Sequence, residues 1–176
     1  MEKGTNNKYF GGLRKDLSLW YFTIQCMNQK IRSIPKNVTA VCGFVHIDNS
    51  FDSIVAIVNN KRGVDVPGGH LEKDETPKNA FKREVLEEAC VKLGEIKPFA
   101  LLESDRDIEK SFIVFYFSVG IMLPFNPSVE VSRRQIMLYK DFIKNYCGNK
   151  SLMEALLFSD EYNKVKTSFR KRDGLD

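Results

Sequence analysis

The stretch that decides the fold of this chain is GHLEKDETPKNAFKREVLEEACV, residues 69–91. The hydroxyl of Thr76 can cap a helix, because it can accept a hydrogen bond from a free backbone N–H of the first turn. Pro77 suits the first helical position, where its missing N–H costs no hydrogen bond. The sequence therefore predicts a helix from Pro77 to about Ala89.

The predicted helix has two chemically different faces, because successive side chains are rotated by about 100° around a helix axis. One face carries the apolar side chains of Phe81, Val85 and Ala89. An adjacent arc carries three carboxylates, those of Glu84, Glu87 and Glu88. We expect the helix to bury the apolar face and to present the carboxylates beside it.

Three neighbouring carboxylates near the end of a helix are unfavourable by themselves. Like charges at i, i+4 destabilise a helix by about 0.2–0.5 kcal/mol, and the helix dipole disfavours negative charge near the C-terminus. A hard divalent cation reverses this argument, since it takes oxygen ligands and can bridge to phosphate oxygens. The simpler interpretation is a solvated acidic face that has Lys82 and Arg83 as partners.

The residues around these carboxylates resemble the Nudix signature, a fixed spacing of glycine, glutamate, Arg-Glu, an aliphatic residue, Glu-Glu, glycine and an aliphatic residue. The matching positions in this chain are Gly69, Glu75, Arg83, Glu84, Val85, Glu87, Glu88 and Val91. Residues 62–69, RGVDVPGG, also resemble the strand and loop that precede the motif in this family. The resemblance implies an α+β protein, a Nudix α/β/α sandwich with a mixed β-sheet.

The resemblance also implies a metal site that holds Mg²⁺, with Mn²⁺ as a substitute. The implied ligands are the carboxylates of Glu84, Glu87 and Glu88 and the backbone carbonyl of Gly68. Arg83 resembles the family residue that orients a motif carboxylate, here Glu75 or Glu84. A guanidinium suits this role because it can hold a carboxylate through two hydrogen bonds.

The implied reaction is the attack of water on phosphorus, with the metal lowering the pKa of the attacking water. The catalytic residues implied by the motif are Arg83, Glu84, Glu87 and Glu88. The general base is either Glu84 or a glutamate outside the motif, of which Glu130 is the first candidate and Glu103 the second. Candidate substrate-binding residues are Arg62, Gly69 and His70. For His70, a solvent-exposed turn is the alternative interpretation.

One position departs from the signature, because Cys90 stands where glycine is expected. Glycine after a helix usually adopts a left-handed conformation, which costs a residue with a Cβ roughly 1–2 kcal/mol. Either Cys90 adopts this conformation under strain, or the helix ends differently and uses Gly94 further along. Glycine supplies no ligand at this position, so we expect reduced stability rather than lost catalysis.

Apolar and β-branched runs elsewhere in the chain predict strands. These runs are 38–47, 53–58, 61–65 as the return of a hairpin, 97–103, 111–119 and 135–139. Pro67, Gly68 and Gly69 are expected to stop regular structure. Residues 151–166 are expected to form a closing helix with Leu152, Ala155, Leu156 and Phe158 facing inward.

The terminal segments are expected to lie outside the central domain, residues 35–168. Residues 1–34 are predicted to be an N-terminal extension packed on that domain. Within it, apolar residues between 13 and 31 recur at helical spacing, which favours an amphipathic helix or a helix followed by a strand. Residues 169–176 are predicted to be a solvated tail, and basic residues near the C-terminus, Lys166 among them, are expected to be solvated as well.

Composition points to one globular domain, since 43% of the 176 residues are hydrophobic and 28% are charged. The formal net charge of +4 suits an anionic substrate but is too small to favour a nucleic-acid partner. The four cysteines lack the spacing of a zinc or redox motif, which indicates buried free thiols in a reducing cytosol. The N-terminus lacks the apolar core of a signal peptide, and the longest apolar run, 112–117, is too short to span a bilayer. We therefore expect a cytoplasmic protein without a membrane partner.

The expected function is Mg²⁺-dependent hydrolysis of a phosphoanhydride bond in a small nucleoside diphosphate derivative, with nucleoside triphosphates as one such substrate. Two alternatives stay open. One is a non-catalytic regulatory module that binds nucleotides on the same fold, because a fold alone does not fix a function. The other is an RNA 5′-end pyrophosphohydrolase. A homodimer is a further expectation, since dimers are frequent among Nudix proteins.

Overall fold

The computed structural model describes residues 8–13, 19–26, 34–104 and 111–171. Its strands are β1 Lys8–Leu13, β2 Leu19–Cys26, β3 Val38–His46, β4 Ser53–Asn59, β5 Gly63–Asp65, β6 Gly68–His70, β7 Val91–Ser104, β8 Ser111–Met122 and β9 Val131–Leu138. Its helices are α1 Pro77–Ala89, α2 Tyr139–Asn145, α3 Lys150–Leu157 and α4 Asp160–Arg170. Within the described part of the chain, no helix is both long enough and apolar enough to cross a membrane.

The strands form two sheets. The larger sheet has six strands in the order β1-β2-β7-β8-β3-β6. It is mixed, because β3 and β8 are parallel whereas the other neighbours are antiparallel. The smaller sheet, β5-β4-β9, is antiparallel throughout.

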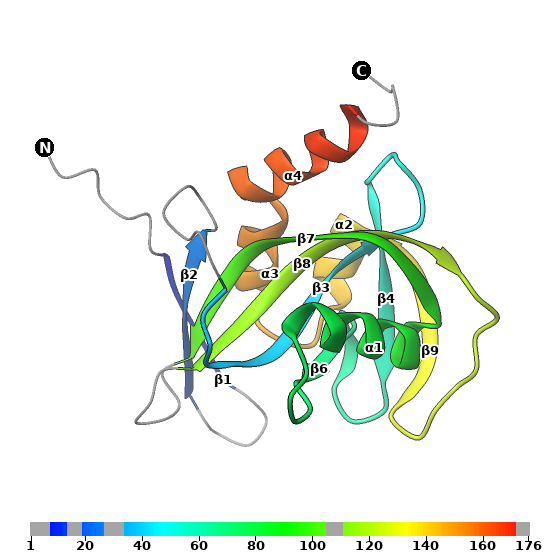
Figure 1. Ribbon diagram of the computed structural model, residues 1–176, viewed down its shortest axis with the longest axis horizontal. Coiled ribbons are helices and arrows are strands. Elements are labelled where there is room, and N and C mark those ends of the chain that lie inside the picture. Colours follow the sequence, from blue (N-terminus) through cyan, green and yellow to red (C-terminus); the bar gives the residue numbers. More distant parts are fainter. Residues whose placement is uncertain (1–7, 14–18, 27–33, 105–110, 172–176) are drawn as a thin grey trace, which may run out of the picture.

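Helices cover both faces of the larger sheet, as Figure 1 shows. Side chains alternate between the two faces of a strand, so Val41 and Val45 of β3 join one apolar cluster and Phe44 joins the other. The first cluster contains the apolar face of α1, and the second contains buried residues of α3 and α4. This arrangement confirms the predicted α+β sandwich with a mixed sheet.

Most of the predicted elements are present. The helix over Pro77–Ala89 is confirmed, with the Thr76 side chain accepting a hydrogen bond from Asn79 N. The predicted strands are confirmed with shifted ends, and the hairpin pairs β4 with β5. The expectation that Pro67, Gly68 and Gly69 stop regular structure is wrong at the glycines, because residues 68–70 form β6 and pair with β3.

A continuous helix in the N-terminal segment is wrong, whereas the alternative of a helix followed by a strand is confirmed in its strand. Residues 19–26 form β2, which pairs with β1 on one side and with β7 on the other. Apolar spacing alone favoured a helix, whereas the free edge of β7 supplies backbone hydrogen-bond partners for a strand. Residues 14–18 and 27–33 of that prediction lie outside the described residues.

The C-terminal region also differs from expectation. The single helix predicted over residues 151–166 is interrupted, because Ser159 caps a new helix, α4, through Tyr162 N. Leu152 and Leu156 are buried and Ala155 is partly buried, but Phe158 at the break is 62% exposed. Phe169 is buried in the core, so the predicted solvated tail cannot begin at residue 169. Residues 172–176 lie outside the described residues.

Two smaller expectations fail because of the same packing. Lys166 is not solvated, since its Nζ donates to the carbonyl of Phe51 at 3.0 Å and lies 3.6 Å from Asp52. Cys42 and Cys90 are partly buried, as expected for core thiols, but Cys147 is exposed. All three thiols are free. Cys26 lies where side chains are not described.

His46 lies in the core with both ring nitrogens paired. Nδ1 lies 2.7 Å from the carbonyl oxygen of Ser53, and Nε2 lies 3.0 Å from the hydroxyl of Tyr162. The Tyr162 hydroxyl in turn pairs with that of Tyr139. Burial lowers the pKa of His46 to about 4, because the apolar surroundings disfavour the charged ring.

We expect His46 to make the fold acid-sensitive. The unfolded chain binds a proton at His46 near pH 6.5 and the folded chain near pH 4, so the stabilisation is complete above pH 6.5 and is lost as the pH falls from 6.5 to 4. Between pH 7 and pH 5 this loss should be about 2 kcal/mol. Denaturant unfolding of the wild type and of His46→Gln at both pH values measures it. The variant should lack this share of the pH dependence, and equal pH dependence in the two proteins would contradict the assignment.

Candidate active site

Arg83 is the centre of a cluster of acidic side chains on α1 and on the turn before it. Its guanidinium holds Glu75 through two hydrogen bonds, Nη2 to Oε2 at 2.9 Å and Nε to Oε1 at 3.2 Å. Nη1 lies 2.8 Å from Glu84 and 3.3 Å from Glu87, and Nη2 also donates to the carbonyl of His70. The expected pairing of Arg83 with Glu75 or Glu84 is therefore confirmed for both. Hydrogen bonding to Arg83 lowers the pKa of Glu75.

Glu88 differs from the other motif carboxylates because it is buried, with only 8% of its surface exposed. Its Oε2 accepts a hydrogen bond from the backbone N–H of Gly68 at 2.9 Å. Burial raises the pKa of Glu88 to about 7, and the negative charge of Glu84 raises it as well. The end of α1 is thus tied to Gly68 and Gly69 at the start of β6, called the glycine turn below, by a carboxylate that is costly to ionise.

The two glycines before α1 allow the backbone to approach these carboxylates. A Cβ on Gly69 would lie only 2.3 Å from Oε1 of Glu84, and a Cβ on Gly68 would lie 2.3 Å from the carbonyl oxygen of Val41. Larger residues would displace either the carboxylate or strand β3. The turn therefore requires glycine at both positions for reasons of space.

The donors fit a divalent cation in chemistry, although they are not yet gathered around a common point. Among the described residues, no three acidic, histidine or cysteine side chains form a preformed cation site. The reason is that Glu84 and Glu87 are both turned toward Arg83. Glu84 and Glu88 nevertheless lie close enough for the charge of one to raise the pKa of the other. A cation between these carboxylates would remove this repulsion.

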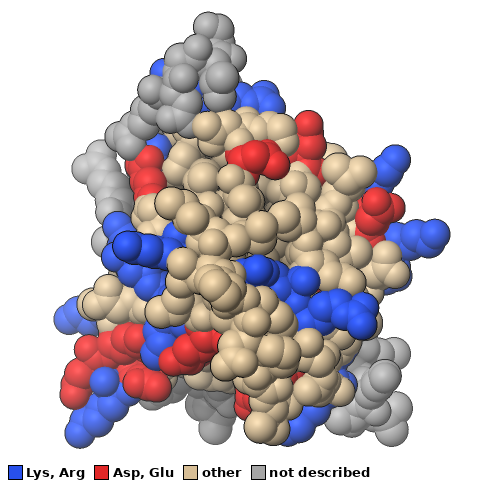
Figure 2. Space-filling model, turned by 90° about the vertical axis from the view of Figure 1, so that its right-hand side faces the viewer, with Lys and Arg blue, Asp and Glu red and all other residues tan. Residues whose placement is uncertain are grey.

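The side chains of α1 make a locally acidic surface. Figure 2 shows Asp and Glu side chains gathered at the lower left, on the side of the molecule where α1 lies, with Lys and Arg among them. Glu87 contributes the most exposed motif carboxylate, with 59% of its side chain accessible. This surface places carboxylate oxygens, which suit a metal ion, beside the positive side chains of Lys and Arg, which suit a phosphate.

Two of the predicted substrate-binding residues, Arg62 and His70, differ in how they relate to this cluster. The Arg62 side chain is half exposed and pairs with Asp65 at 3.1 Å, and its charge lowers the pKa of Glu88. His70 is exposed, and its described polar contact with the motif is through its backbone carbonyl.

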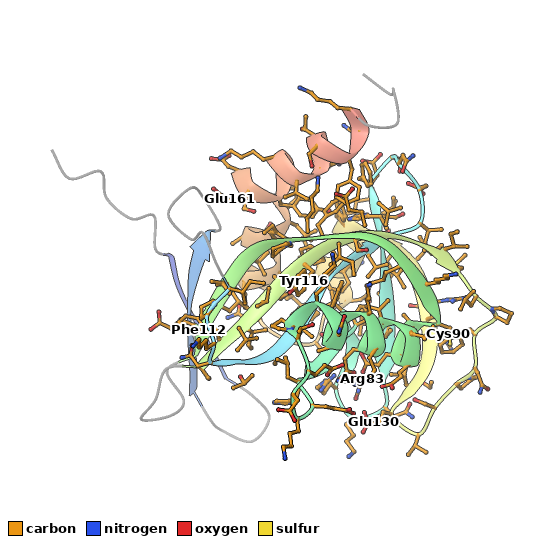
Figure 3. All side chains as sticks on the ribbon, viewed as in Figure 1. Arg83, Cys90, Phe112, Tyr116, Glu130 and Glu161 are labelled. Atoms are coloured by element: carbon orange, nitrogen blue, oxygen red, sulfur yellow. The ribbon has the colours of Figure 1, made fainter. Side chains whose placement is uncertain are left out.

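The two outside candidates for the general base lie on segments other than α1. Glu130 is exposed in the loop before β9, and its backbone carbonyl accepts from Asn60 N; Figure 3 labels it at the lower edge of the view. Glu103 is buried in β7 opposite Phe112. Among the described residues, no hydrogen bond or ion pair joins the Glu130 carboxylate to α1.

Sequence reasoning missed two neighbours of the cluster. Asp65 raises the pKa of Glu88 and binds Arg62, and Glu72 lies 3.8 Å from Nε of Arg83. Both residues are close in sequence to the motif, and their charge was the available signal. Arg134 had no local signal, because it reaches the end of α1 from β9, 45 residues from Ala89 in the sequence.

Cys90 adopts the left-handed conformation that the signature reserves for glycine, with φ 49° and ψ 48°. Its backbone N–H closes the helix onto Leu86 O and Val85 O. Of the two alternatives, Cys90 under strain is therefore correct. Gly94 lies within β7 and does not end the helix.

Replacement of Cys90 by glycine should stabilise the protein by about 1 kcal/mol. Glycine removes the left-handed penalty of roughly 1–2 kcal/mol but loses part of this gain to the greater freedom of the unfolded chain. The melting temperature should rise by roughly 2–4 °C without a change in turnover. Cys90→Ala is the matched control, since it keeps the Cβ and should not melt higher. A glycine variant that melts no higher than the alanine variant would refute the strain.

A mixed sheet between helices, with four glutamates on and just before the first helix, defines the class of protein: an α+β sandwich with an acidic first helix. The chain belongs to the Nudix family, since the NUDIX domain model matches residues 38–151. The chain is thereby a Nudix hydrolase by family, a class of enzymes that act on phosphorus-containing acid anhydrides. Members of this family generally use divalent metal ions. No curated protein sequence matches the chain.

Several solved structures share the fold. A variant of the Bacillus subtilis pyrophosphohydrolase BsRppH superposes with a TM-score of 0.66 at 16% identity, covering 90% of this chain and 97% of that one. A MutT protein from Bacillus halodurans gives 0.52 at 17% identity, covering 69% and 82%. A Nudix family hydrolase from Clostridium perfringens gives 0.52 at 13% identity, covering 75% and 99%. At these identities the similarity establishes the fold alone.

Proposed function

We propose that this protein hydrolyses a phosphoanhydride bond of a small nucleoside diphosphate derivative, nucleoside triphosphates included, in a reaction that requires Mg²⁺. The observation that carries the proposal is the contact between Glu88 and Gly68, beside the carboxylate of Glu84. It brings two motif carboxylates to the glycine turn, where backbone can approach a phosphate. Mg²⁺ is the ion of choice because it prefers oxygen ligands, and Mn²⁺ can substitute.

In this proposal the metal ligands are the carboxylates of Glu84, Glu87 and Glu88 and the carbonyl of Gly68. The bound cation would neutralise charge on the phosphates and lower the pKa of water. Arg83 keeps Glu75 and Glu84 in fixed orientations through the bonds described above. Arg62, Gly69 and His70 would contact the substrate phosphates, and Glu130 or Glu84 would accept the proton from the attacking water.

A substrate panel tests the proposal. The wild type, Glu87→Gln and Glu154→Gln are each incubated with nucleoside triphosphates and nucleoside diphosphate derivatives in Mg²⁺, in Mn²⁺ or in a chelator. Glu154 is exposed on α3 and provides the matched control for the same chemical change on another helix. We expect turnover by the wild type and by Glu154→Gln, with loss of turnover in Glu87→Gln and in chelator. Equal turnover in all three proteins would remove Glu87 from the site.

A second candidate function is the removal of pyrophosphate from RNA 5′ ends. The superposition on a pyrophosphohydrolase over 97% of that chain supports including such substrates. Binding of RNA should weaken steeply with salt, because phosphate contacts release counterions. Comparison of 5′-triphosphate RNA with a free nucleoside triphosphate at two salt concentrations separates the two functions. Turnover of neither class, with metal bound, would favour a non-catalytic nucleotide-binding module.

Two further properties belong to this proposal. The free thiols of Cys42, Cys90 and Cys147 suit a reducing compartment, which supports a cytoplasmic location. A homodimer stays a prediction, and sedimentation at two protein concentrations tests it.

A further inference from the structure

We infer that Arg134 is a positioning residue that holds the C-terminal end of α1, and with it the carboxylate of Glu88, in place. Its Nη1 lies 2.9 Å from the carbonyl oxygen of Ala89, 3.0 Å from that of Cys90 and 3.0 Å from that of Leu123. The first two carbonyls belong to the end of the motif helix. The inference rests on the proposed role of Glu88 as a metal ligand.

The end of α1 needs such a partner. The last carbonyls of any helix lack partners within the helix and carry partial negative charge. The last turn of α1 contains Glu87 and Glu88 and no basic residue, so the negative charge of these side chains adds to that of the free carbonyls. Cys90 also holds a left-handed conformation there. A guanidinium at this end pairs with the free carbonyls and opposes the negative charge of the dipole.

Arg134 reaches this position from a strand that is distant in sequence. It lies on β9, where its backbone is opposite Ile57 of β4 in the antiparallel register. Its guanidinium lies over the ring of Phe125, 5.4 Å from the ring centre. Strand pairing and ring contact fix the side chain, so its hydrogen bonds to α1 are made by a preorganised group.

The consequence for the site follows from the neighbouring residue. Glu88 directly precedes Ala89, and its carboxylate binds Gly68 N from the last turn of α1. If the end of the helix moves, the carboxylate moves away from the glycine turn. Arg134 therefore controls the position of a proposed ligand without touching substrate or metal. Figure 3 labels Cys90 at this end of α1, away from Arg83.

Mn²⁺ binding without substrate tests the inference. The free ion is followed by electron paramagnetic resonance during titration of the wild type, Arg134→Met, Arg134→Lys, Arg133→Met and Glu88→Gln, well below the melting temperature of each. Arg133 is exposed on the same strand and provides the matched control. We expect the dissociation constant to rise roughly tenfold in Arg134→Met, the size typical of residues that orient a ligand. Arg134→Lys should recover part of the affinity, and Arg133→Met should equal the wild type.

The outcomes separate the inference from the proposed function. If Glu88→Gln weakens Mn²⁺ binding but both Arg134 variants bind like the wild type, Arg134 does not position the ligand and the inference is overturned. A lower melting temperature with unchanged Mn²⁺ affinity has the same meaning, since a purely structural role predicts it. If the wild type binds no Mn²⁺, or Glu88→Gln binds it unchanged, the proposed metal site fails and the inference fails with it. If Arg134→Met does not fold, the Mn²⁺ affinity of Arg134→Lys is compared with that of the wild type, and equal affinity overturns the inference.

Discussion

Glu88→Gln should abolish most of the hydrolysis and at the same time stabilise the metal-free protein. The folded state raises the pKa of Glu88 to about 7 from 4.5, so the fold loses stability as the pH rises from 4.5 to 7, and the loss is complete above pH 7. A glutamine amide is neutral, and its oxygen can still accept the hydrogen bond from Gly68. In chelator at pH 8 we expect a gain of about 2 kcal/mol and a melting temperature roughly 5 °C higher. Turnover with Mg²⁺ should fall at least about a hundredfold.

Addition of Mg²⁺ should reverse the order of stability. Binding to the folded state stabilises the wild type in proportion to the logarithm of the metal concentration, whereas the variant lacks a ligand. Glu87→Gln is the matched control, because Glu87 is mostly exposed and should lose activity without any gain in the chelator. Thermal melts in chelator and in Mg²⁺, with turnover measured alongside, provide the comparison. A Glu88→Gln variant that is less stable than the wild type in chelator would show that the buried carboxylate is not costly.

Arg83→Lys should lower kcat/KM by roughly ten- to a hundredfold, although it keeps the positive charge. Arg83 binds Glu75 through two nitrogens and still reaches Glu84 and the carbonyl of His70. A lysine ammonium is a point charge and cannot hold these acceptors in one plane. Without the guanidinium, Glu84 has no fixed orientation toward the glycine turn. The melting temperature should fall as well.

Lys82→Met is the control for this variant, since Lys82 is exposed on the same helix and adjacent to Arg83. It removes a positive charge from the acidic surface and should leave both turnover and melting temperature unchanged. Steady-state kinetics at saturating Mg²⁺ compare the two variants. Full activity in Arg83→Lys would mean that charge alone suffices and that the two-nitrogen grip on Glu75 is dispensable.

The charges of Glu88 and Arg83 are expected to affect the stability of the metal-free protein in opposite directions. In the proposed mechanism Glu88 lowers the stability of the metal-free protein, because burial makes its ionisation costly, and a bound cation would offset this cost. Arg83 pairs with two of the proposed metal ligands, Glu84 and Glu87, in the absence of a cation. We therefore expect metal binding to draw the exposed carboxylate of Glu87 away from Arg83, while Glu75 and Glu84 keep their hydrogen bonds to the guanidinium.

The sequence by itself determined the motif helix and the identity of the cluster around Arg83. Helix caps, the apolar face and the set of neighbouring carboxylates depend on residues within a few positions of one another, and the 3.6-residue period fixes which of them share a face. For this reason the helix bounds Pro77–Ala89 were predictable. The pairing of Arg83 with Glu75 or Glu84 was expected from the resemblance to the Nudix signature, and both pairs are present.

Only the tertiary structure decided the environment of that cluster. The hydrogen bond between Glu88 and Gly68 joins residues that are 20 positions apart, and the contact of Arg134 with Ala89 joins residues that are 45 positions apart. The N-terminal strands likewise depend on the edge of β7, which local spacing could not reveal. Burial and strand pairing arise from contacts between distant segments, and no period in the sequence encodes which segments meet.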